Sequence, residues 1–154
     1  RVFVYHRWQS LCQSELTPAN LIDFHTNHKF GILAHDEAAY RELGQIVAEA
    51  GSADLLQLRE RYATLLMTAM KKRATRKLHS NVLTHIMGFL KDKIDSGDKA
   101  ELLDVIEKYR HGQIPLIVPI TLLKHHLRRY PDPYIARQSY LNPHPEELML
   151  RNSL

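Results

Sequence analysis

Lysine and arginine side chains gather in two stretches of this sequence that contain no aspartate or glutamate. The first runs from Arg61 to Lys91 and holds seven of these cations, five of them within KKRATRK. The second runs from Lys108 to Tyr130 and holds five. Nucleic acids bind such surfaces because neutralising their phosphates releases condensed counterions. The two stretches hold these cations without any acid, yet the whole chain carries a net charge of only +4, so the rest of the chain is negative overall. This segregation of charge is more informative than the net value.

Helical periodicity predicts that these cations lie on the exposed faces of two helices. In a helix from about 75 to 94, Leu78, Val82 and Phe89 mark a buried stripe, and the cations lie opposite. In a helix from 119 to 130, the cations fill one arc on the side away from the leucines. The predicted phosphate contacts are Lys71, Lys72, Arg73, Arg76, Lys77, Lys124, Arg128 and Arg129, with His79, Asn81 and His125 for further contacts to an exposed nucleotide.

An ordinary solvated surface is the alternative interpretation, with long cationic side chains covering the core. Two features favour a phosphate-binding surface instead. Acids are absent from both stretches, although ordinary surfaces mix the two signs, and the hydroxyl and amide groups of Thr75, Ser80, Asn81 and Thr84 accompany the cations. Tyr130, Tyr134 and Tyr140 are candidates for base stacking, although spacing favours a core position for Tyr130.

Ten histidines raise the question of a metal site, for which His25, His28 and His35 are weak candidates. The sequence contains no HExxH motif, and no cysteine accompanies these residues. Buried, hydrogen-bonded histidines are therefore the better interpretation, and we expect no metal. By the same helical phase, His85 and His126 belong to apolar faces, and His79 lies at a boundary.

Independent catalysis is not expected, and neither is a cofactor in this domain. The sequence has no glycine-rich phosphate loop and no evident pair of catalytic carboxylates. Cys12 is the only cysteine, so no intramolecular disulfide can form, which fits a cytoplasmic protein. The longest apolar run, Ile114 to Ile120, is too short to cross a membrane.

The sequence predicts an all-α, single-domain bundle of about six to eight helices. A proline-containing extended connector is expected near 112–119, because two prolines exclude a central strand. Residues 1–16 are interpreted as a helical junction or linker and 17–154 as the domain; the opening RVFVYHRWQSL reads like part of a longer protein. The other predicted helices run from Thr17 to Phe30 with a break at Gly31, from Asp36 to Gly51, from the cap Ser52 onward, over 99–110, from Tyr134 and after Pro145.

Several long motifs, in order, resemble the YbgA-like family, a domain of unknown function. They are FHTNHKFGILAHDEAAYRELG, TRKLHSNVLTHIMGF, YRHGQIPLIVPITLLKHHLRRYPDPY and LNPHPEELMLRN. The family occurs alone and as the C-terminal half of fusions whose N-terminal half resembles thiouracil desulfidases, which use an iron–sulfur cluster. The resemblance implies a role beside thiouridine desulfuration in RNA, with a desulfidase-type domain in cis or in trans. Phe89 and His126 stand where tyrosine is common in the family.

Three functions remain open on the sequence alone. The first is an RNA-binding accessory module, with tRNA as the expected RNA. The second is a protein-interaction or structural domain that docks the desulfidase without touching RNA. The third is a small metal or ligand site built on histidines. The first unites the cationic faces with the family context, although the two arguments are separate and the second is analogy.

Overall fold

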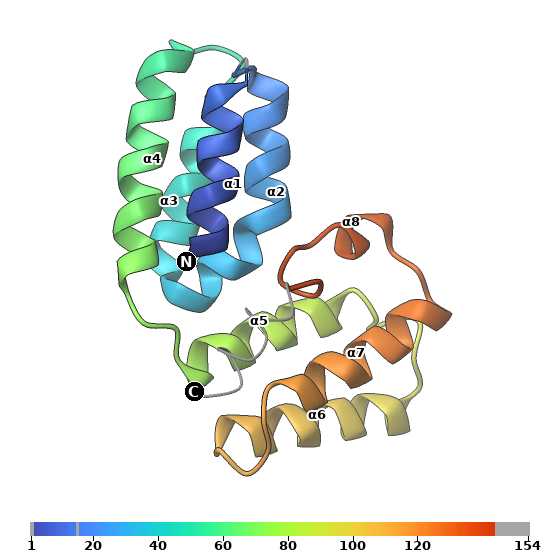
Figure 1. Ribbon diagram of the computed structural model, residues 1–154. Coiled ribbons are helices and arrows are strands. Elements are labelled where there is room, and N and C mark those ends of the chain that lie inside the picture. The colour runs from blue at the N-terminus through green and yellow to red at the C-terminus, as the bar shows by residue number, and fades with distance from the viewer. Residues whose placement is uncertain (1, 15, 144–154) are drawn as a thin grey trace. The chain divides into compact units, whose positions relative to one another are not determined.

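The computed structural model describes residues 2–14 and 16–143, and within them it shows helices, turns and loops but no strand. The all-α class is therefore confirmed (Figure 1). The chain divides into two compact units, Arg1–Ala74 and Thr75–Leu154, a division that the sequence analysis did not predict. None of the described helices is both long and apolar enough to cross a membrane. The helices are α1 (Val2–Gln13), α2 (Pro18–His35), α3 (Glu37–Ala48), α4 (Leu55–Lys71), α5 (Arg76–Gly88), α6 (Ser96–Arg110), α7 (Ile117–Arg129) and α8 (Pro133–Ala136).

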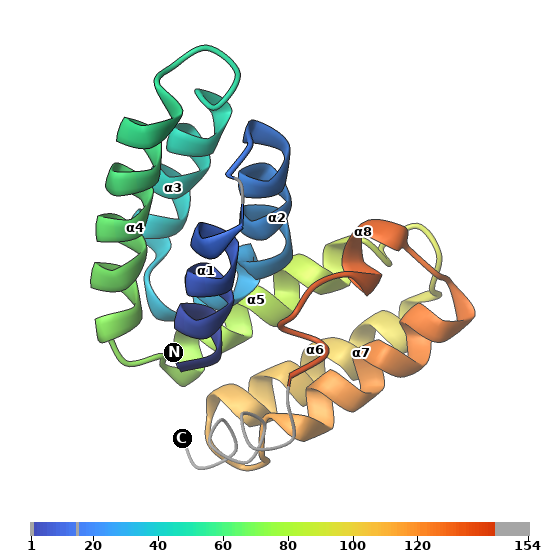
Figure 2. The same ribbon diagram turned by 45° about the horizontal axis from the view of Figure 1, so that its top comes forward.

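Helices α1 to α4 form the first unit, in which α2 packs against the other three (Figures 1 and 2). Aromatic rings lie at the centre of its core. Trp8 stacks on Tyr62 with ring centroids 5.1 Å apart and meets Phe24 edge-on at 5.2 Å. Such contacts stabilise a core beyond the area that they bury. Helix α1, predicted as a junction, thus supplies a core side chain of this unit, while the domain boundary at residue 17 stays a prediction.

Side-chain caps fix where the helices of the first unit begin. Thr17 forms a capping box with Asn20, and the Asp36 carboxylate accepts from two backbone N–H groups at the start of α3, as expected for such residues. Two predictions were wrong: Asp54, not Ser52, caps α4, and Gly31 does not interrupt α2. A glycine inside a helix costs only about 1 kcal/mol, which the burial of Phe30 and its neighbours can offset.

Helices α5, α6 and α7 lie side by side in the second unit and contact one another (Figure 2). Helix α5 ends at Gly88, earlier than predicted, and turns lead on to α6. The connector before α7 is also shorter than predicted, because α7 begins at Ile117 and Pro119 lies in its first turn. A proline is tolerated there, since the N–H that it lacks would have no partner in the helix. The predicted helix after Pro145 lies outside the described residues.

Gly112 ends α6 in a conformation that only glycine adopts without strain, with φ at +77°. A Cβ at this position would lie 2.6 Å from Nη1 of Arg76. Gly31, by contrast, is helical, and a Cβ there would meet nothing within 4 Å.

We therefore expect Gly112→Ala to lower the free energy of unfolding by about 1–2 kcal/mol, because of backbone strain. Gly31→Ala is the matched control, and it should raise stability by about 0.5–1 kcal/mol. Urea denaturation followed by circular dichroism measures both. Equal effects of the two substitutions would contradict this description of Gly112.

Candidate nucleic-acid interface

The exposed face of α7 carries four of the predicted RNA contacts. Lys124, His125, Arg128 and Arg129 are all exposed, as predicted. The opposite face is buried and includes Ile120, Leu123 and His126. Within residues 2–14 and 16–143, none of the four forms an ion pair with a carboxylate, in contrast to several cations elsewhere. The cations of this α7 face are therefore not held in an ion pair by any described carboxylate.

Local contacts hold part of this face in place. Nη2 of Arg128 lies 3.4 Å from Nδ1 of His125, one turn earlier. The guanidinium of Arg129 lies over the ring of Tyr130, 5.8 Å from its centroid, within the range of a cation–π contact. Basic side chains in the last turn also interact favourably with the negative end of the helix dipole. The charge therefore stabilises α7 and leaves its donors accessible to a ligand.

The cations at the start of α5 lie toward the end of the second unit that is opposite to the last turn of α7. Arg76 contacts Gly112, directly after α6, whereas His126 of α7 lies beside Asp98 in the first turn of α6, with Nδ1 and Oδ2 3.9 Å apart. Helix α6 has 15 residues, which corresponds to about 22 Å. Arg76 and the α7 face are thus separated along the bundle, and they do not form one continuous cluster.

Arg76 is exposed, but it also interacts with a residue of α6. It lies close enough to Tyr109 to act on that hydroxyl electrostatically. Burial raises the pKa of Tyr109 to about 12, and the positive charge of Arg76 opposes the rise. Lys77, the next residue, is exposed.

Lys72 is held by the first unit itself. Its Nζ lies 2.5 Å from Oδ2 of Asp36, and its carbonyl accepts a hydrogen bond from Nδ1 of His35 at 2.7 Å. Burial tends to raise the pKa of Asp36, but Lys72 and the N–H groups at the start of α3 outweigh it and lower that pKa. Lys72 therefore joins the end of α4 to the start of α3, and its charge is already paired. Lys71 and Arg73 beside it are exposed.

The buried face of α5 differs from the predicted one. His79 is only 2% exposed, and its Nδ1 lies 2.7 Å from the Tyr140 hydroxyl oxygen, within hydrogen-bond distance. The prediction that His79 lies at the boundary of the apolar face was therefore wrong. Ser80 is also buried, and its hydroxyl donates to the carbonyl of Arg76. His85 and Phe89, predicted in the apolar stripe, are exposed, and Asn81 is half-buried. Tyr140 is a core residue and no longer a stacking candidate.

The three histidines considered for a metal serve the first unit in separate ways. His25 is buried, with Nδ1 3.0 Å from the Tyr62 hydroxyl, and His28 packs on the Phe24 ring. His28 and His35 lie seven residues apart in one continuous helix, or about 10 Å along its axis. Among the described residues, no three His, Cys, Asp or Glu side chains are grouped closely enough to hold a metal ion.

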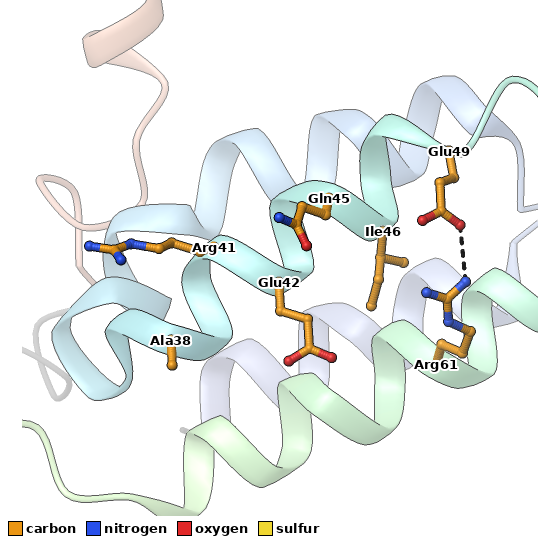
Figure 3. Close-up of a pocket in the computed structure, with 7 residues that line it drawn as sticks. All are labelled: Ala38, Arg41, Glu42, Gln45, Ile46, Glu49 and Arg61. Carbon is orange, nitrogen blue, oxygen red and sulfur yellow. Dashed lines mark hydrogen bonds and ion pairs between the residues drawn. The ribbon is translucent and has the colours of Figure 1, made fainter.

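A groove between α3 and α4 was not anticipated from the sequence (Figure 3). It has a volume of about 450 Å³, with the Ile46 side chain among its lining residues. Arg61 at one end pairs with Glu49 at 3.0 Å, and Arg41 pairs with Glu37 at 2.6 Å. Because its arginines are already paired and Glu42 adds a negative charge, this groove does not suit a polyanion.

The comparison with known proteins places the chain in a family. Residues 29–145 match the model described as "Protein of unknown function (DUF1722)". The chain belongs to this family. It is also 32% identical over 154 residues to the uncharacterized protein YbgA of Escherichia coli (strain K12), which covers 99% of this chain and 91% of that protein. No solved structure matches it. The resemblance seen in the sequence motifs is thus confirmed, and the DUF1722 match includes all of the α7 face.

Burial of His25 has a measurable consequence for stability. Desolvation, assisted by the charge of Lys29, lowers its pKa to about 4 from 6.5. The folded chain therefore binds fewer protons than the unfolded chain at pH values between these two pKa values. We expect the free energy of unfolding to fall as pH drops from about 6.5 to 4, by at most about 1.4 kcal/mol per pH unit from this group.

His25→Gln keeps a hydrogen-bonding side chain opposite Tyr62 but cannot titrate. Other acids and histidines contribute to both proteins, so the difference between their urea-denaturation profiles from pH 7 to 4 isolates His25. The variant should lose less stability than the wild type over this range. Parallel profiles would show that His25 is not held neutral by the fold.

Proposed function

We propose that this chain is an RNA-binding module, with tRNA as its RNA, that acts beside an iron–sulfur thiouridine or thiouracil desulfidase domain. The observation that carries the proposal is the α7 face, in which Lys124, Arg128 and Arg129 are exposed together and form no ion pair with a described acid. A cationic arc on one helix suits a phosphate backbone, which is a continuous line of negative charge. The role belongs in the cytoplasm, where tRNA is found.

Contacts of this kind position an RNA but do not select its sequence. Lysine and arginine on α7 would bind phosphates, and His125 would add a hydrogen bond. Selection of the modified nucleotide and the chemistry on it would then belong to the desulfidase domain. That division of roles fits a chain in which Cys12 is the only cysteine, since iron–sulfur clusters are held mainly by several cysteine thiolates.

The desulfidase partnership is supported by the family's fusions with desulfidase-type domains and not by a contact in this structure. A basic face can also meet an acidic protein surface, in which case the chain would bind the desulfidase and no RNA. The salt dependence of tRNA binding separates the two functions, because only RNA binding releases condensed counterions on this scale.

The test replaces Lys124, Arg128 and Arg129 together by alanine. Each lost phosphate contact should reduce the slope of log K against log salt by roughly 0.7–0.9, so we expect a change of about two units and weaker tRNA binding at physiological salt. Fluorescence anisotropy with labelled tRNA across a salt series measures both quantities.

The control replaces three exposed cations that are already paired with acids: Arg41, Lys108 and Arg110. It removes the same formal charge, so a general effect of net charge would appear equally in both triple variants. We expect the control to keep most of the wild-type slope. Equal slopes in all three proteins would remove α7 from the interface, and absence of tRNA binding by the wild type would refute the proposed function.

A further inference from the structure

Two aromatic rings, an exposed Phe89 and a half-buried Tyr134, are stacked in the second unit. Phe89, at the C-terminal cap of α5, and Tyr134, in the first turn of α8, have ring centroids 5.6 Å apart and planes inclined by 23°. Phe89 keeps 38% of its surface exposed. Periodicity predicts Phe89 inside the buried stripe of α5, but the helix ends one residue earlier. The fold thus leaves a large apolar ring at the surface, already stacked on one partner.

Hydrogen bonds hold the backbone at both rings. The N–H of Phe89 donates to the carbonyls of Ile86 and Met87, as the last bonds of α5. The N–H of Tyr134 donates to Oδ1 of Asp132 at 3.0 Å, and its carbonyl accepts from Nε2 of Gln138. Because the two rings are already stacked on each other, they lose less conformational freedom on binding than free side chains would, and this favours recognition.

The stack lies at the same end of the second unit as the cations of the last turn of α7. Figures 1 and 2 both show the end of α5, the end of α7 and α8 at this end. Tyr134 follows Arg129 by five residues, a span of at most about 18 Å even if fully extended. Lys91, two residues after Phe89, is also exposed. The carboxylate of Asp132 caps α8 by accepting from the N–H groups of Tyr134 and Ile135.

We propose that Phe89 and Tyr134 form a stacking platform for an unpaired nucleobase, so that the RNA recognised by this chain is a single-stranded segment or loop. The inference rests on the proposed function and deepens it. Bases within a duplex are already stacked, whereas an unpaired base can stack on an aromatic side chain while neighbouring phosphates meet lysine and arginine. An aromatic stack at the same end of the second unit as the last turn of α7 offers both kinds of contact.

The test compares Phe89→Leu with Phe89→Tyr. Leucine keeps an apolar side chain of similar size but removes the ring, whereas tyrosine keeps the ring. Binding of a single-stranded RNA of about twelve nucleotides and of a duplex of the same sequence is measured by anisotropy at one salt concentration. Stacking of a base on an aromatic side chain is worth about 1–3 kcal/mol, so Phe89→Leu should weaken single-strand binding by roughly five-fold or more. Duplex binding should be unchanged, and Phe89→Tyr should bind like the wild type.

A fluorescence measurement tests stacking directly. A single-stranded RNA with 2-aminopurine in place of one base reports stacking on an aromatic ring by fluorescence quenching. We expect quenching on binding that is lost with Phe89→Leu. Absence of quenching at every labelled position, or an equal loss of single-strand and duplex binding in Phe89→Leu, would overturn the platform. If RNA binding still depends on the α7 cations in that case, the proposed function survives; if the wild type binds no RNA, both fail.

Discussion

Burial of one side of α7 determines which of its groups reach solvent. Ile120, Leu123 and His126 lie in the interior of the second unit, and an α-helix turns about 100° per residue. Lys124, His125, Arg128 and Arg129 are therefore directed outward together. The segment from Lys108 to Tyr130 contains no acid, and among residues 2–14 and 16–143 no carboxylate forms an ion pair with these four side chains. The positive face is thus a consequence of apolar packing combined with the absence of acids.

The two cationic stretches differ in what the fold makes of them. In the first, Lys72 pairs with Asp36 and Arg76 lies against Gly112, so both have places in the structure of their own units. In the second, the α7 side chains contact one another or Tyr130. A cation held by a carboxylate has less to gain from a phosphate than an unpaired one, since it must first give up its partner. The α7 face is therefore the stronger candidate for a polyanion.

Sequence reasoning succeeded where a helix has one clear apolar side and failed where polar groups are buried. The exposed and buried faces of α7 follow from its leucines. In α5, periodicity predicts Leu78 and Phe89 in the buried stripe, but His79 and Ser80 are buried beside Val82 and its apolar neighbours. His79 is accommodated there because Tyr140 supplies a hydrogen bond from far along the chain. Periodicity cannot reveal such a partner. The early end of α5 at Gly88, which leaves Phe89 exposed, was equally invisible.

The predicted helix starts were correct at two caps, whereas one predicted helix break was wrong. Thr17 and Asp36 cap helices as predicted, because a short side-chain oxygen can accept the free N–H groups at a helix start. Gly31 was taken as a break, yet α2 continues through it, since its buried neighbours favour the helix. The division into two units depends on contacts between distant elements, which local sequence patterns do not contain.

The central claim is that α7 and the adjacent aromatic stack form the RNA-binding surface, and mapping of amide chemical shifts tests it most directly. Titration of tRNA into isotope-labelled protein should shift or broaden the amide signals of residues 124–134 and of Phe89, while those of α3 and α4 around Glu42 stay unchanged. Perturbations confined to the first unit, or none at all at low salt, would contradict the account.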